Sequence, residues 1–187
     1  MSDNIRHGGR WLEFHETTFR DAHGHEKSWE FVRRRESHGA CSILAVTSED
    51  LPRLALVRQF RPPLAAWILE LPAGLIELGA DAGETALREL AEETGCQGVV
   101  RAVGPFVYNS PGLTDEKVSL VQVEVTSVGR SRPEADEAIE VVWAPLRGLV
   151  NFLRTHEAAG TRIDAKLWCL AQGMTLGRAD AGVVDPL

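Results

Sequence analysis

The segment LPAGLIELGADAGETALRELAEETG, residues 71–95, constrains the fold most, because it marks both ends of a helix and its two faces. Asp81 followed by Glu84 has the D-x-x-E form of a capping box, which predicts that a helix begins at Asp81. Gly95 supplies a C-terminal stop. One side of the helix is apolar and would pack against a sheet; it carries Ala86, Leu87, Leu90 and Ala91.

The segments around this helix read mainly as strands. Residues 10–20 and 28–35 indicate a hairpin around the turn DAHGHEK, and further strands are expected at 40–47, 53–60, 65–74, 99–108, 117–127 and 138–143. Helical spacing returns over 146–158 and 164–177. This order predicts an α/β fold, a sandwich with a mixed β-sheet and a small N-terminal β-hairpin appendage. We expect a β segment over 1–39 and the main domain over 40–187.

Composition narrows the class of protein. The 187 residues carry a net charge of −7, whereas general nucleic-acid binders carry basic footprints, so we expect no nucleic-acid partner. No apolar run approaches the ~20 residues that cross a bilayer, and the N-terminus lacks the apolar stretch of a signal peptide. Cys41, Cys96 and Cys169 have no metal-ligand spacing, which predicts buried free thiols and a cytoplasmic location.

Three carboxylates share the polar face of the central helix. Glu89, Glu92 and Glu93 stand at i, i+3 and i+4, where side chains are neighbours. Like charges at this spacing destabilise a helix by roughly 0.2–0.5 kcal/mol for each pair. A bound divalent cation would compensate the repulsion, since Mg²⁺ takes oxygen ligands from carboxylates and phosphates. The glutamates alone leave open a solvated acidic face, which is common on surface helices.

Two neighbouring features favour a site. The loop AGLIELG leads directly into the helix, and Arg88 lies inside the acidic cluster, where it can pair with the carboxylates or orient them. Gly74, five residues, Ala80, seven residues and then the run RELAEETGC, 88–96, resemble the Nudix box. That pattern is Gly, five residues, Glu, seven residues, then Arg-Glu-aliphatic-any-Glu-Glu-any-Gly-aliphatic. The chain departs from it at Ala80, which replaces the first Glu, and at Cys96, which takes the last aliphatic position.

The resemblance implies a Nudix-type α/β/α sandwich that hydrolyses a nucleoside diphosphate linked to another moiety, with Mg²⁺ or Mn²⁺. It implies metal ligation by Glu89 and Glu93, together with Glu92 and the backbone carbonyl of Ala73, and a catalytic role for Glu92 and Arg88. Metal ions in such a site neutralise phosphate oxygens, orient an in-line attack and lower the pKa of a bound water.

The resemblance extends over most of residues 8–172 to the ADP-ribose/ADP-sugar pyrophosphatase branch. Pro111 lies sixteen residues after Gly95, an offset typical of that branch. The resemblance implies that Trp11 and Trp29 sandwich an adenine ring across a homodimer. Stacking of this kind contributes about 0.5–1.5 kcal/mol beyond area burial. Periodicity alone would instead make both tryptophans ordinary core or interface anchors.

The same branch implies that Arg34 and Arg61 hold the phosphates or the ribose, a task that suits the guanidinium fork. A plain solvated arginine remains the alternative for Arg34, which lies in a run of three. A glutamate from the loop PEADEAIEVVW, 133–143, is expected to ligate metal or position the attacking water. Glu137 matches that position best, with Glu134 as the alternative and a solvated acidic turn as the non-functional interpretation.

These observations lead to one preferred hypothesis and two alternatives. The preferred one is a homodimeric enzyme that converts ADP-ribose or a related ADP-sugar to AMP and a sugar phosphate. Because tryptophan stacking tolerates any flat base, another substrate such as a GDP-hexose stays open. Ala80 motivates the other alternative, a non-catalytic ADP-ribose sensor.

Overall fold

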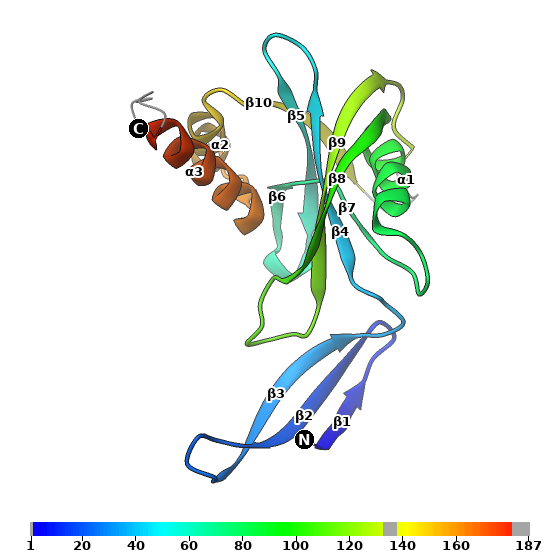
Figure 1. Cartoon of the computed structure of the whole chain (residues 1–187), viewed down its shortest axis with the longest axis vertical. Coiled ribbons are helices and arrows are strands. Elements are labelled where there is room, and N and C mark those ends of the chain that lie inside the picture. The colour runs from blue at the N-terminus through cyan, green and yellow to red at the C-terminus, as the bar shows by residue number, and fades with distance from the viewer. Residues whose placement is uncertain (1, 133–137, 181–187) are drawn as a thin grey trace.

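The computed structural model of the chain describes residues 2–132 and 138–180. Glu134 and Glu137, the two candidate acids of the 133–143 loop, therefore lie outside the described residues. Figure 1 shows two helical layers on either side of a large sheet, with a separate small sheet below them. No helix of the described part is long and apolar enough to cross a membrane.

The small sheet has three antiparallel strands in the order β1–β2–β3. Their bounds are β1 (Ser2–Gly8), β2 (Leu12–Arg20) and β3 (Glu26–Arg34). The expected hairpin between β2 and β3 is confirmed, and its turn is closed by Asp21, whose carboxylate accepts hydrogen bonds from the N–H groups of His23 and His25. β1 adds a third strand that the sequence pattern did not predict.

The large sheet mixes parallel and antiparallel neighbours. Its strands are β4 (Ala40–Thr47), β5 (Arg53–Arg61), β6 (Ala66–Glu70), β7 (Ala73–Leu75), β8 (Cys96–Tyr108), β9 (Lys117–Val128), β10 (Ile139–Pro145) and β11 (Arg162–Ile163). The order is β11–β6–β5–β4–β9–β8, with β10 paired to β5 and β7 paired to β4. The pairs β4–β9 and β11–β6 are parallel. The mixed sheet is thus confirmed.

One expected strand is split in two. Residues 65–74 were expected to form a single strand, whereas the structure ends β6 at Glu70 and starts β7 at Ala73. Pro72 lies between them and has no N–H to donate to a sheet, although its carbonyl accepts a hydrogen bond from Ile43 N–H (2.8 Å). Because of this break, β6 pairs with β5 whereas β7 pairs with β4. The change of partner places β7 beside the central helix.

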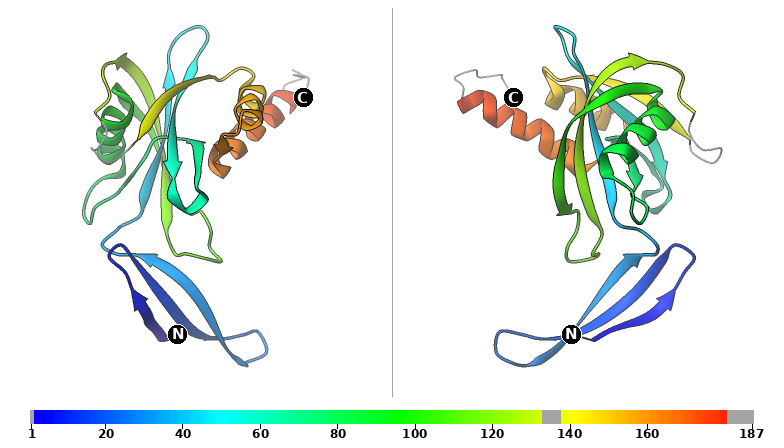
Figure 2. Two further views of the ribbon diagram at one scale, coloured as in Figure 1. Left: turned by 180° about the vertical axis from the view of Figure 1, so that it is seen from behind. Right: turned by 45° about the vertical axis from the view of Figure 1, so that its right-hand side comes forward.

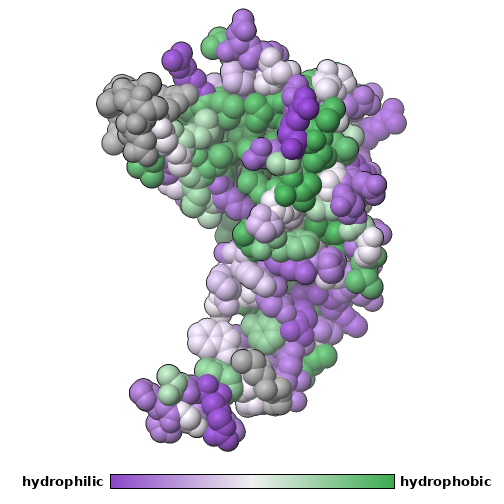
Figure 3. Space-filling model, viewed as in Figure 1, coloured by the Kyte–Doolittle hydropathy of each residue, from purple (hydrophilic) through white to green (hydrophobic). Residues whose placement is uncertain are grey.

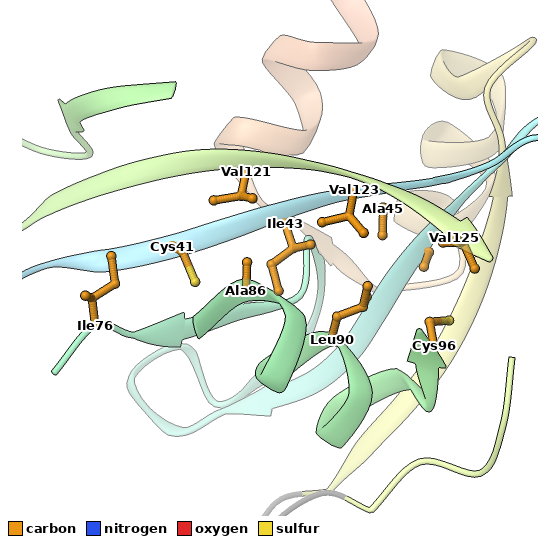
Figure 4. Close-up of a cluster of buried hydrophobic side chains, with 11 residues drawn as sticks. Cys41, Ile43, Ala45, Ile76, Ala86, Leu90, Cys96, Val121, Val123 and Val125 are labelled. Atoms are coloured by element: carbon orange, nitrogen blue, oxygen red, sulfur yellow. The ribbon is translucent and has the colours of Figure 1, made fainter. Parts of the chain in front are cut away.

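Three helices cover the large sheet, α1 (Ala82–Thr94) on one face and α2 (Leu149–Ala158) with α3 (Ala165–Asp180) on the other (Figures 1 and 2). On the α1 side, Ala86 and Leu90 point into a buried cluster with side chains of β4 and β9 (Figure 4). A second buried cluster joins α2 and α3 to β5 and β6, with Leu153 and Leu167 fully enclosed. The expected α/β/α sandwich is therefore confirmed.

The cysteines only partly follow expectation. Cys41 and Cys96 are buried, and burial raises the pKa of the Cys41 thiol to about 11. Cys169 on α3 is exposed, so the prediction that it is buried was wrong. The helical pattern over 164–177 was correct, but it did not say which side of that helix meets the sheet.

The predicted ends of α1 are correct. The Asp81 carboxylate accepts hydrogen bonds from the N–H groups of Gly83 (2.8 Å) and Glu84 (3.1 Å), and so caps the first turn. At the other end Gly95 takes a left-handed conformation with φ of 73°, and its N–H donates to Ala91 O. Because the site residues lie on α1, both caps fix where they stand.

We expect Asp81→Ala to lower the free energy of unfolding by about 1 kcal/mol, because two N–H groups of the first turn lose their acceptor. Asp81→Ser should retain most of the stability, since a serine hydroxyl can accept the same bonds. Urea unfolding followed by circular dichroism measures both variants. Equal losses for alanine and serine would contradict the capping role.

Candidate active site

The carboxylate face of α1 lies directly against β7. Glu93 is buried, with 7% of its surface exposed, and its carboxylate accepts a hydrogen bond from the Ala73 N–H at 3.2 Å. Glu89 lies over Gly74 so closely that a Cβ on residue 74 would be 2.2 Å from the Glu89 Cδ. A side chain at position 74 would therefore force the Glu89 side chain to move from this position.

Arg88 binds two of the carboxylates on this face of α1. Its Nη2 donates to Glu89 Oε1 (2.7 Å) and its Nη1 donates to Glu92 Oε2 (2.9 Å). Partial burial lowers the pKa of Arg88, but the charges and hydrogen bonds of Glu89 and Glu92 outweigh it, so the pKa is raised overall. The guanidinium thus offsets the like-charge repulsion of the face.

The donor chemistry of this face fits a hard divalent cation, since Glu89, Glu92 and Glu93 offer only carboxylate oxygens next to the Ala73 backbone. Among residues 2–132 and 138–180, however, no group of three or more His, Cys, Asp or Glu side chains is arranged to hold a metal ion. The contacts above explain this: Arg88 holds Glu89 and Glu92, while Glu93 binds a backbone N–H. These residues therefore suit a divalent cation in the type of ligand and in its position, and metal ligation stays a prediction.

Ala80, the departure from the expected pattern, lies exposed in the loop between β7 and α1. Its N–H donates to Glu77 O at 3.0 Å. Because Arg88 is already held by Glu89 and Glu92, the absence of a glutamate at position 80 leaves that guanidinium paired.

A second group of expected residues meets where the small sheet touches the loop 109–116. Val32 N–H donates to Leu113 O (2.8 Å), Val32 forms a parallel bridge with Thr114, and Trp29 Nε1 donates to Gly112 O (3.1 Å). The loop therefore continues the small sheet at the free edge of β3. In Figure 3 this small sheet forms the lower lobe, where hydrophilic residues predominate.

This junction forms an open cavity of about 310 Å³, near the lower end of the volumes typical of ligand pockets. It is lined by Trp29, Phe31, Arg33, Tyr108, Pro111, Thr114 and Asp115. The structure thus brings together Trp29 and Pro111, two expected substrate-binding residues that are far apart in the sequence.

Trp11 does not reach this cavity. Its carbonyl accepts a hydrogen bond from Arg35 N–H, so it lies beyond the Arg34 end of β3. Trp29 pairs with Thr17, six residues back along β3 from Arg35. At ~3.3 Å per residue the two tryptophans are about 20 Å apart, which is too far for both rings of one chain to stack on one base.

The two expected phosphate-binding arginines are each paired with a carboxylate. Arg34 Nε donates to Glu116 Oε1 (2.7 Å), and Arg61 Nε donates to Glu70 Oε1 (2.9 Å). Burial raises the pKa of Glu70, and the Arg61 hydrogen bond and charge oppose that shift. In both pairs the guanidinium makes a charge-assisted hydrogen bond, the kind of contact that it also makes with phosphates.

Comparison with known proteins assigns the family. The family model of the NUDIX domain matches residues 36–167, most of the chain. The chain belongs to the Nudix family. An ADP-sugar pyrophosphatase of Mus musculus is 35% identical to it over 96% of this chain and 88% of its own. An ADP-ribose pyrophosphatase of Saccharomyces cerevisiae (strain ATCC 204508 / S288c) is 32% identical over 90% and 79%.

The fold comparison agrees. A crystal structure of an ADP compounds hydrolase superposes with a TM-score of 0.68, covering 98% of this chain and 95% of its own, at 18% identity. That likeness confirms the Nudix fold, including the sandwich predicted from the sequence. Family membership also makes this protein a Nudix hydrolase.

Two residues at the junction were not singled out by the Nudix pattern. Arg33 lines the cavity beside Pro111, and Asp3 on β1 binds Arg33. A signal was present in the charge order, because the adjacent arginines Arg33 and Arg34 match the adjacent acids Asp115 and Glu116. The match becomes two ion pairs only because the fold places this loop at the edge of β3, and that contact joins residues far apart in the sequence.

We expect Gly74→Ala to lower the free energy of unfolding by about 1–3 kcal/mol, the usual cost of overpacking. In a Glu89→Ala background the same change should cost much less, because the three atoms nearest to the added Cβ all belong to Glu89. Urea unfolding of the four proteins in this cycle measures the coupling. Equal costs in both backgrounds would show that the Glu89 contact does not require the glycine.

Proposed function

We propose that this Nudix protein hydrolyses the pyrophosphate bond of ADP-ribose or a related ADP-sugar, giving AMP and a sugar phosphate. The observation that carries the proposal is the similarity to the ADP-sugar pyrophosphatase of Mus musculus along 96% of the chain. That similarity includes the small sheet and the Pro111 loop as well as the Nudix domain. The aromatic pocket at Trp29 suits a flat base, and the carboxylate face of α1 would suit a charged diphosphate once it holds a divalent cation.

The α1 face would hold the divalent cation, which we propose to be Mg²⁺, with Mn²⁺ able to replace it. Glu89, Glu92 and Glu93 would supply carboxylate oxygens and Ala73 its backbone carbonyl. The bound ion would neutralise phosphate oxygens and lower the pKa of a coordinated water. Arg88 keeps Glu89 and Glu92 in place and limits their mutual repulsion.

Three further residues complete the proposed chemistry at the diphosphate. Arg34 and Arg61 would exchange their present carboxylate partners for phosphate oxygens, which suit a guanidinium fork. Glu137 would position the attacking water or add a metal ligand, with Glu134 as the alternative; both lie outside the described residues.

The base would be held between two copies of the chain. Because Trp11 and Trp29 are about 20 Å apart along β3, a sandwich of one adenine needs one tryptophan from each protomer. Both rings are available, with 64% of Trp11 and 51% of Trp29 exposed. We therefore propose a homodimer in which residues 1–39 supply the contact and residues 40–187 the hydrolase domain. The buried thiols Cys41 and Cys96 suit a reducing, cytoplasmic location.

The test is product analysis of purified protein incubated with Mg²⁺ and a panel of ADP-, GDP- and UDP-sugars. We expect AMP and ribose 5-phosphate to appear fastest from ADP-ribose, and chelation of the metal to abolish turnover. Faster turnover of a GDP-hexose would retain the chemistry and replace the substrate. Saturable binding of ADP-ribose without turnover, in Mg²⁺ or Mn²⁺, would favour the sensor instead.

Two variants test whether a carboxylate of the proposed site, rather than any carboxylate on α1, is needed for catalysis. Glu93→Gln should lower kcat at least about 100-fold, because a proposed metal ligand is lost. Glu84→Gln, on an exposed part of the same helix, is the matched control and should keep wild-type kinetics. Similar kinetics in both variants would exclude Glu93 from the reaction.

A further inference from the structure

We propose that Arg33 is a positioning residue for substrate binding, which fixes the loop 109–116 against β3 and so holds Pro111 opposite Trp29. The inference rests on the proposed function for its substrate and on the structure for its geometry. It assigns a task to the first strand as well, because Asp3 of β1 is one of the two carboxylates that bind Arg33.

Arg33 connects three separate segments. Its Nε donates to Asp115 Oδ2 (2.6 Å) on the loop, and its Nη1 donates to Asp3 Oδ2 (2.8 Å) on β1. The guanidinium carbon also lies 5.2 Å from the centroid of the Phe31 ring, within cation–π range. One side chain of β3 therefore links the wall of the cavity to the loop that closes it.

The two ion pairs between β3 and the loop lie on opposite faces of the sheet. Successive side chains of a strand alternate between faces, so Arg33 with Asp115 shares the face of Trp29, and Arg34 with Glu116 takes the other. When Arg34 exchanges Glu116 for a substrate phosphate, its pair with the loop is lost. Among the residues that the structure describes, the Arg33–Asp115 pair is then the ion pair that still joins β3 to this loop.

Asp3 is itself held on its other side. His15 is 3% exposed, and its Nδ1 lies 2.6 Å from Asp3 Oδ1 while its Nε2 lies 3.1 Å from Glu13 Oε2. The His15 hydrogen bond lowers the pKa of Asp3, so it stabilises the charged form of the carboxylate that binds Arg33. The His15 ring also stacks on Phe31, with centroids 5.0 Å apart. β1 thereby anchors Arg33 in the orientation that reaches Asp115.

The experiment compares Arg33→Gln, Asp115→Asn and their double variant with wild type. Two readouts are used: exchange of the Trp29 indole N–H by NMR, assigned with Trp29→Phe, and the Kd of ADP-ribose measured by calorimetry without divalent metal. We expect indole exchange about tenfold faster, because the hydrogen bond to Gly112 O opens more often. The Kd and KM should rise about fivefold while kcat stays within about twofold.

Three controls separate positioning from general damage. The double variant should be no worse than either single variant, because both remove the same pair. Arg33→Lys should recover most of the affinity, since it keeps a charge near Asp115. Arg101→Gln removes a similar exposed cross-strand pair with Glu124, between β8 and β9, and should leave both readouts unchanged.

Unchanged indole exchange in Arg33→Gln would overturn the positioning role whatever the activity. Faster exchange with an unchanged Kd would overturn the link between the loop and substrate binding. A fall in kcat with unchanged KM and Kd would also overturn it, because the residue would then act on the chemical step. Failure of the wild type to hydrolyse any sugar of the panel would overturn the proposed function alone, since indole exchange and ADP-ribose affinity are measured without turnover.

Discussion

The contact between α1 and β7 is the constraint on which the rest of the site depends. Glu93 is buried against the Ala73 N–H and Glu89 lies on Gly74, so two acidic side chains are part of the packing between helix and sheet. Burying carboxylates is costly unless they are paired or hydrogen bonded. Arg88 and the β7 backbone meet that requirement, which ties the positions of the acids to the stability of the fold.

The same logic explains how a chain with a net charge of −7 can offer sites for an anionic substrate. Arg34 and Arg61 are each paired with a carboxylate of the chain. Such a pair keeps the guanidinium oriented, and on the proposed function an incoming phosphate would replace one anion by another. Substrate recognition here would rest on exchange of partners within fixed geometry rather than on a surplus of positive charge.

Local signals account for what the sequence predicted well. Asp81 and Gly95 mark the ends of α1 through hydrogen bonds that span only a few residues, and the Nudix pattern follows from contacts within residues 74–96. The errors have non-local causes. β1 forms only by pairing with β2, and the split at Pro72 depends on β4 accepting β7 as a neighbour. Sequence periodicity carries neither kind of information.

The site residues divide in the same way. The α1 carboxylates are recognisable because one helix brings them together in the order that the Nudix pattern predicts. The cavity beside Trp29 needs a loop more than eighty residues further along the chain, held at the edge of β3 through Val32. Loops tolerate sequence change better than the elements they join. On the proposed function, selection among substrates would therefore change at the junction of Trp29 and Pro111 while the packing of Glu89 on Gly74 stays constant.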